Sequence, residues 1–301
     1  MHVSGVTLLP AKDKHMTEFN NRSVYHIVSG LATSDGAGVQ LTRYIGSPDV
    51  EDLDPFLLLD FFESDNPNDY IAGFPSHPHR GFETVTYLLA GKVRHKDSTG
   101  REGILEAGGI QWMTAGRGII HSEMPEQEHG RLAGFQLWVN LPAKRKMCQP
   151  AYHEYSATEI PVEVRNDSTT VRVITGSTDR QTCGPVTGID TDPLYFDITL
   201  SPKSDFRETL PPNHAAFIFV IEGTVRLLSS KTNDSIDAKQ LAILGKGDHV
   251  AVTVDGSGAR FLLVAARPLN EPIARYGPFV MNTRSEIDQA IHDFNSGRFS
   301  N

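Results

Sequence analysis

Residues 87–94 read YLLAGKVR, and residues 219–226 read FVIEGTVR. In both segments a mainly apolar run reaches a glycine and a short alternating run follows, which is typical of a strand, a turn and a second strand. A second pair of segments follows in the same order: residues 135–142 read FQLWVNLP and residues 261–268 read FLLVAARP. The chain therefore contains an internal repeat, and we expect two copies of one β unit.

Short apolar or alternating runs, separated by Gly, Pro, Asn and Asp, recur along most of the chain. This pattern is typical of an all-β sandwich or barrel protein. We predict one β-barrel in residues 1–142 and a second in residues 143–301. A single helix is predicted near the end, within residues 281–297, where Thr283 can form a capping box with Glu286.

The composition limits the partners of the protein. The 301 residues are 39% hydrophobic and carry a net charge of -9, which suits a sizeable core and disfavours a direct nucleic-acid surface. The first residues lack a signal-peptide core and no 18-residue apolar run occurs, so we expect a cytoplasmic protein, or a nuclear one in a eukaryote, without a membrane partner. Cys148 and Cys183 lie far apart and form no CxxC pattern, which disfavours disulfides and thiolate zinc sites.

Two pairs of candidate metal ligands lie in the first half of the chain. His77 and His79 are two residues apart in SHPHRG, and His121 and Glu123 have the same spacing in IIHSEM. In extended chain, residues i and i+2 point to the same face, so each pair can face one barrel interior. One such pair is a weak signal, but two pairs within a repeat-built barrel favour a mononuclear site of three imidazoles and one carboxylate. The second half has no HxH segment, so we expect its barrel to be metal-free.

Glu83 follows the first histidine pair by four residues and has two interpretations. It can take part in the metal site, or it can bond to a neighbouring arginine such as Arg80. Apolar residues near the ligands are candidate pocket walls, namely Phe74, Trp112 and Met113.

The segments HPHRGFETVTYLL, QWMTAGRGIIHSEMP, FQLWVNLP and GPFVMNT together resemble the pirin family of the cupin superfamily. The resemblance implies two jelly-roll cupin barrels, each built of antiparallel strands. The barrels would lie face to face, with a metal in the N-terminal barrel only. The metal ligands of the family fall on His77, His79, His121 and Glu123. Most other cupins take their carboxylate ligand from the position of Glu83, so Glu83 is expected to support the ligands or to replace Glu123.

The resemblance also implies an activity. Similar pirins are quercetin 2,3-dioxygenases, in which O₂ opens the heterocycle of a flavonol, and Glu123 would then be both a ligand and a proton acceptor. The alternative is an iron-dependent, redox-sensing regulator that binds a transcription factor or a metabolic enzyme. In either case we expect one divalent transition metal per chain, iron first, with copper, manganese and nickel as alternatives.

Overall fold

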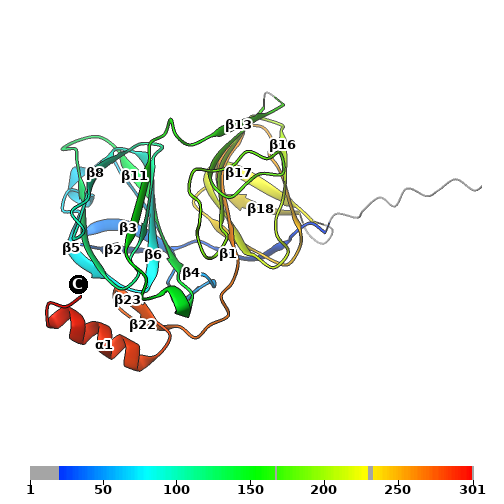
Figure 1. Cartoon of the computed structure of the whole chain (residues 1–301). Coiled ribbons are helices and arrows are strands. Elements are labelled where there is room, and N and C mark those ends of the chain that lie inside the picture. Colours follow the sequence, from blue (N-terminus) through cyan, green and yellow to red (C-terminus); the bar gives the residue numbers. More distant parts are fainter. Residues whose placement is uncertain (1–19, 167, 230–232, 300–301) are drawn as a thin grey trace, which may run out of the picture.

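The computed structural model describes residues 20–166, 168–229 and 233–299. The N-terminal residues on which the absence of a signal peptide was predicted lie outside this part of the chain. Among the described residues, none of the helices has the length and apolar character needed to span a bilayer. The chain folds into two β-barrels that lie against each other, with a long helix below the first barrel (Figure 1). The predicted fold class is confirmed.

The first barrel consists of a seven-stranded sheet with the order β12-β9-β6-β11-β4-β3-β2 and a four-stranded sheet with the order β5-β10-β7-β8. All paired strands in it run antiparallel. Its strands are β2 (Leu31–Asp35), β3 (Val39–Ile45), β4 (Phe56–Ser64), β5 (Phe74–His79), β6 (Phe82–Ala90), β7 (Lys92–Asp97), β8 (Glu102–Glu106), β9 (Ile110–Thr114), β10 (Ile119–Pro125), β11 (Leu132–Asn140) and β12 (Ala151–Tyr155). Two short 3-10 helices, η1 (Pro67–Asp69) and η2 (Ala143–Arg145), lie in its connections.

The second barrel is one ten-stranded sheet, in which β1-β19-β17-β21-β15-β14-β13 are neighbours and β16, β18 and β20 complete the wall. Its strands are β1 (Val24–Val28), β13 (Val162–Arg165), β14 (Thr169–Thr175), β15 (Leu194–Leu200), β16 (Asp205–Thr209), β17 (Ala215–Leu228), β18 (Asn233–Asp237), β19 (Leu241–Leu244), β20 (His249–Thr253) and β21 (Ala259–Ala266). Buried apolar side chains such as Phe206 and Phe261 fill its interior.

The internal repeat appears in the strand pairing. β6 pairs with β11 in the first barrel, and β17 pairs with β21 in the second, so the repeated segments occupy equivalent positions. The repeated glycines, Gly91 and Gly223, have φ of 85° and 76°, a region that favours glycine. A Cβ on Gly223 would lie 2.3 Å from the Gly258 carbonyl oxygen, so this turn also lacks room for a side chain.

The two barrels meet through their large sheets, which form one shared apolar core. Phe56 of the first barrel contacts Phe217 of the second, with ring centroids 5.2 Å apart. Burying one such side chain contributes about 1.5–3 kcal/mol. The Tyr87 hydroxyl donates a 2.6 Å hydrogen bond to Asp197, which adds a specific polar contact to this core.

Both ends of the described chain cross to the other barrel. β1 pairs with β19 of the second barrel, although it precedes the first barrel in sequence. After β21 the chain returns to the first barrel as β22 (Ala274–Tyr276), β23 (Phe279–Met281) and α1 (Arg284–Asn295) (Figure 1). β12 also stays in the first sheet. The boundary between the two barrels therefore lies between β12 and β13 rather than at residue 142. In addition, each barrel contains a segment from the opposite end of the chain.

The returning segment is held by a cap and by a buried lysine. The capping box between Thr283 and Glu286 is present, as predicted. Lys146 is 1% exposed, and its Nζ donates to the Gly81 carbonyl oxygen at 2.8 Å and to the Val280 carbonyl oxygen at 3.0 Å. A third bond, of 2.7 Å, goes to the side-chain oxygen of Asn140. Burial lowers the pKa of Lys146 to about 8.

Candidate metal centre

Two neighbouring strands position the predicted ligands. β5 and β10 pair antiparallel, and His121 lies directly opposite His77. The register shifts between His121 and Glu123, so that Glu123 pairs with Phe74. The i, i+2 spacing in each strand therefore turns the histidines of both strands toward the interior of the first barrel.

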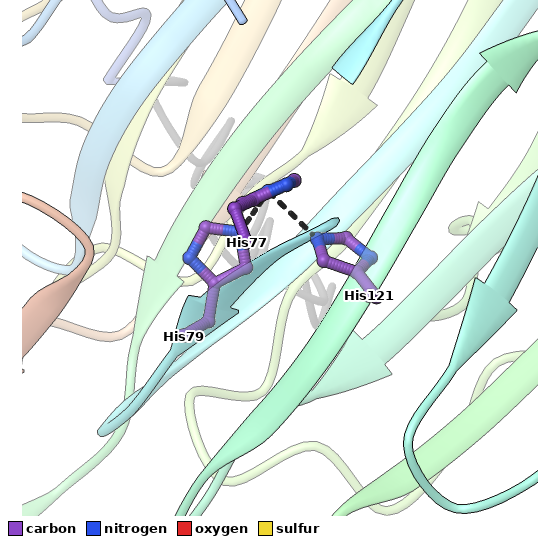
Figure 2. Close-up of side chains that lie close together, drawn as sticks. All are labelled: His77, His79 and His121. Atoms are coloured by element: carbon purple, nitrogen blue, oxygen red, sulfur yellow. Dashed lines mark hydrogen bonds between the residues drawn. The ribbon is translucent and has the colours of Figure 1, made fainter. Parts of the chain in front are cut away.

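The three histidines converge through their Nε2 atoms (Figure 2). The Nε2 atom of His77 lies 2.9 Å from Nε2 of His79 and 3.0 Å from Nε2 of His121. Two nitrogens bound about 2.1 Å from one ion at right angles would lie about 3.0 Å apart. Both distances therefore fit neighbouring ligand positions around a single ion.

The protonation of the histidines also fits a metal. Burial holds the pKa of His79 well below its usual range, and the neighbouring His77 lowers it further. Burial does the same to the pKa of His121, with the three nearby histidines adding to the effect. Both rings are therefore neutral near neutral pH and can offer a lone pair. The outward Nδ1 of His77 lies 2.8 Å from the Pro75 carbonyl oxygen, which leaves its Nε2 lone pair for an ion.

Glu123 lies beside the histidines but is held by other side chains. It is 5% exposed, and its Oε2 accepts a 3.0 Å hydrogen bond from Nε2 of Gln136. The Thr86 hydroxyl lies 2.8 Å from Oε1 of Glu123 and 2.7 Å from Oε1 of Gln136, and its one proton can serve only one of them at a time. The structure thus brings the three histidines together and places the Glu123 carboxylate in the wall of the same cavity.

Glu83 is not brought to the histidines. Its strand, β6, points Val85 and Tyr87 toward the core shared by the barrels, and Glu83 has the same parity as these two residues. Its Oε1 accepts a 2.7 Å hydrogen bond from Thr114, while Oε2 is buried without a partner among the described residues. Burial raises the pKa of Glu83 to about 7, against the hydrogen bond from Thr114 and the nearby indole of Trp112.

A cavity of about 540 Å³ opens onto His77, His79 and Glu123. Phe74, predicted as a wall, and Trp138 line it. The other two predicted walls, Trp112 and Met113, lie in apolar clusters away from the cavity.

Charged side chains of both signs also line the cavity. Arg43 bonds Asp60 through two nitrogens, at 2.8 and 2.7 Å. Arg275, from the returning segment, lies over the Trp138 ring at 4.9 Å. The cavity therefore combines flat aromatic walls with charged side chains of both signs.

Four residues of this region were not singled out from the sequence: Thr86, His95, Gln136 and Trp138. Alternation along a strand could have found three of them, because Thr86 in β6 and Gln136 and Trp138 in β11 alternate with residues that face the other barrel. His95 could be recognised only once β7 was placed beside β10.

Two facing β-barrels, with three converging histidines in the first, define a bicupin with one candidate transition-metal site. The chain belongs to the pirin family: residues 38–139 match the family model described as Pirin, and residues 195–300 match the Pirin C-terminal cupin domain.

Known proteins resemble the chain over nearly its whole length. A pirin-like protein of Caulobacter vibrioides is 53% identical over 278 residues, covering 92% of this chain and 99% of the relative. Pirin of Homo sapiens is 43% identical and covers 88% of this chain and 89% of its own. The crystal structure of a quercetin 2,3-dioxygenase from Acinetobacter baumannii has a TM-score of 0.83 at 35% identity, covering 93% and 98% of the two chains. A bacterial pirin of Escherichia coli in complex with nickel(II), at 20% identity and a TM-score of 0.61, shares the fold over 81% of this chain and 98% of its own.

Proposed function

We propose that the protein is a metal-dependent dioxygenase that opens the heterocycle of quercetin or a related flavonol. The observation that carries this proposal is the opening of the histidine cluster into an aromatic-lined cavity with a carboxylate in its wall. The 35% identical structure from Acinetobacter baumannii, whose name is quercetin 2,3-dioxygenase, supports the same reaction class.

The proposed ion is iron, held by His77, His79 and His121, with Glu123 as the fourth ligand or as a base beside the site. Imidazole and carboxylate donors suit iron, and copper, manganese and nickel are the alternatives. When bound, such an ion supplies redox chemistry with O₂ and lowers the pKa of a coordinated hydroxyl group.

The cavity residues supply binding and orientation. A volume of about 540 Å³ lies in the range of small-molecule sites. Phe74 and Trp138 offer flat apolar surfaces to an aromatic ring system, and Arg275 keeps a positive charge at the Trp138 ring. A polyphenol presents flat rings edged with hydroxyl groups, so its shape matches the aromatic walls and its hydroxyl groups can bond to the charged side chains of the lining.

Glu123 is the proposed acceptor for the hydroxyl proton that a flavonol must lose before it can be oxidised. The Glu123 carboxylate lines the cavity beside the histidines. Gln136 and Thr86 hold it there, so a substrate hydroxyl would meet a carboxylate of fixed orientation.

The test measures O₂ consumption and carbon monoxide release from quercetin by protein loaded with ferrous iron, with the metal content analysed. Equal molar amounts of O₂ consumed and carbon monoxide released are expected. The His79→Ala/His121→Ala variant should be inactive, while His153→Ala, on the exposed face of β12, should retain activity. If wild-type protein fully loaded with iron, and the same protein fully loaded with copper, both failed to turn over quercetin, the proposed dioxygenase activity would be refuted.

A further inference from the structure

His95 lies behind His121, on the side away from the other two histidines. It belongs to β7, which pairs with β10, and its side chain is completely buried. Its Nδ1 lies 3.4 Å from Nδ1 of His121, and the two ring centroids are 5.3 Å apart. The outward nitrogen of a candidate ligand thus meets a second imidazole rather than water.

The contacts of His95 continue to an anchored carboxylate. Its Nε2 lies 3.2 Å from Oδ2 of Asp97. The other oxygen of Asp97 accepts hydrogen bonds from the Thr99 amide at 2.8 Å, the Thr99 hydroxyl at 2.6 Å and the Arg101 amide at 3.3 Å. The turn after β7 therefore fixes Asp97, and Asp97 can only accept the proton of His95.

This chain of contacts has one consistent direction. His95 donates its Nε2 proton to Asp97, so its Nδ1 carries the lone pair. That lone pair accepts the Nδ1 proton of His121, which leaves the lone pair of His121 on Nε2, the atom that faces His77. Stacking of Tyr152 on His95, with centroids 4.7 Å apart and ring planes at 32°, opposes rotation of the ring.

We propose that His95 and Asp97 are positioning residues for the metal site, which fix the tautomer and ring orientation of His121 through a His121–His95–Asp97 hydrogen-bond chain. Their role depends on the metal binding in the proposed function and not on the flavonol substrate. Partners of this kind raise the basicity of a histidine ligand and reduce the freedom it loses on binding an ion.

The experiment uses Co²⁺ as the probe, bound to the full-length protein after removal of endogenous metal. Co²⁺ affinity is measured by the visible absorption of the bound ion in wild type, His95→Phe, His95→Gln and Asp97→Asn. His95→Phe keeps a planar ring without hydrogen bonds, and we expect about 10–100-fold weaker binding. His95→Gln should recover part of the affinity, since its amide has an acceptor for His121 and a donor for Asp97.

Asp97→Asn tests the direction of the chain. An amide has nearly the same shape as the carboxylate, but it places a donor either against His95 or against the Thr99 amide. We expect a loss of Co²⁺ affinity close to that of His95→Phe, although His95 itself is unchanged. His153→Phe, in neighbouring β12, is the matched control and should bind as wild type does.

Proton NMR of the Co²⁺-loaded protein measures the exchange of the His121 Nδ1 proton with water. This exchange would not depend on His95 if His95 only filled space in the core. A histidine bound through Nε2 keeps an exchangeable Nδ1 proton, whose signal the paramagnetic ion shifts far from the normal range. The proton of His121 should exchange slowly in wild type and quickly in His95→Phe. Unchanged Co²⁺ affinity and unchanged exchange in folded His95→Phe or Asp97→Asn would overturn the proposal. Co²⁺ affinity and proton exchange are both measured without quercetin. A negative result in the quercetin assay would therefore not affect this test.

Discussion

Replacing Glu83 with Gln should stabilise the protein at pH 8 and leave its stability nearly unchanged at pH 4.5. Glu83 is 3% exposed in the core between the barrels, and burial raises its pKa from an ordinary value of 4.5 to about 7. One carboxyl oxygen accepts the Thr114 hydrogen bond, and the other has no partner among the described residues. Gln resembles the protonated acid in shape and never ionises, so it removes the cost of a buried charge.

The sign and size follow from the two pKa values. Below pH 4.5 the side chain is protonated in the folded and the unfolded chain, and ionisation costs no stability. Between pH 4.5 and 7 the unfolded chain ionises while the folded chain keeps its proton, so the stability of the wild type falls as pH rises. Above pH 7 the full difference, about 3 kcal/mol, opposes folding of the wild type.

The assay is urea unfolding of both proteins between pH 4.5 and 8, followed by tryptophan fluorescence. At each pH the free energy of unfolding is compared between variant and wild type, so contributions of the other titrating groups cancel. The difference should grow by about 3 kcal/mol in favour of the variant. Glu128→Gln, at an exposed position, should show no such trend. A difference that stays constant with pH for Glu83→Gln would refute the reasoning.

The other predictions concern the site and its support. His79→Ala/His121→Ala should lose bound metal, measured by elemental analysis, while circular dichroism retains the β spectrum. Glu123→Gln should lower quercetin turnover by about 10²- to 10⁴-fold at full metal loading, and an equal rate would exclude Glu123 as the base. Lys146→Met should leave buried carbonyl groups without donors and cost about 2–4 kcal/mol, seen as a lower Tm. His214→Ala, in the second barrel, should change neither metal content nor turnover; loss of either by the folded variant would contradict a site confined to the first barrel.

The sequence predicted the features that depend on local periodicity. The two glycine turns marked the repeat, and the pairing of β6 with β11 and of β17 with β21 confirmed it. The spacing of His77 and His79 predicted a common face, because alternation along a strand needs no knowledge of the fold.

Glu83 shows where this reasoning ends. From His79 to Glu83 is an even number of residues, so one continuous strand would turn both side chains to the same face. Gly81 has a φ of 88°, and the chain turns there from the four-stranded sheet into β6. The parity is lost at this turn, and Glu83 faces the other barrel. His95 was missed for a related reason, since only the pairing of β7 with β10 brings it to His121.

The returning segment bears on how the molecule is made. Arg80, directly after His79, donates to the Asp293 carboxylate of α1 at 2.8 Å and lies over the Phe299 ring. Residue 80 also forms a β-bridge to Phe279 of β23. These partners lie about 200 residues further along the chain than the histidines of β5. Contacts between residues so far apart form only after the intervening chain has been ordered, so we expect the support beneath β5 to form late in folding.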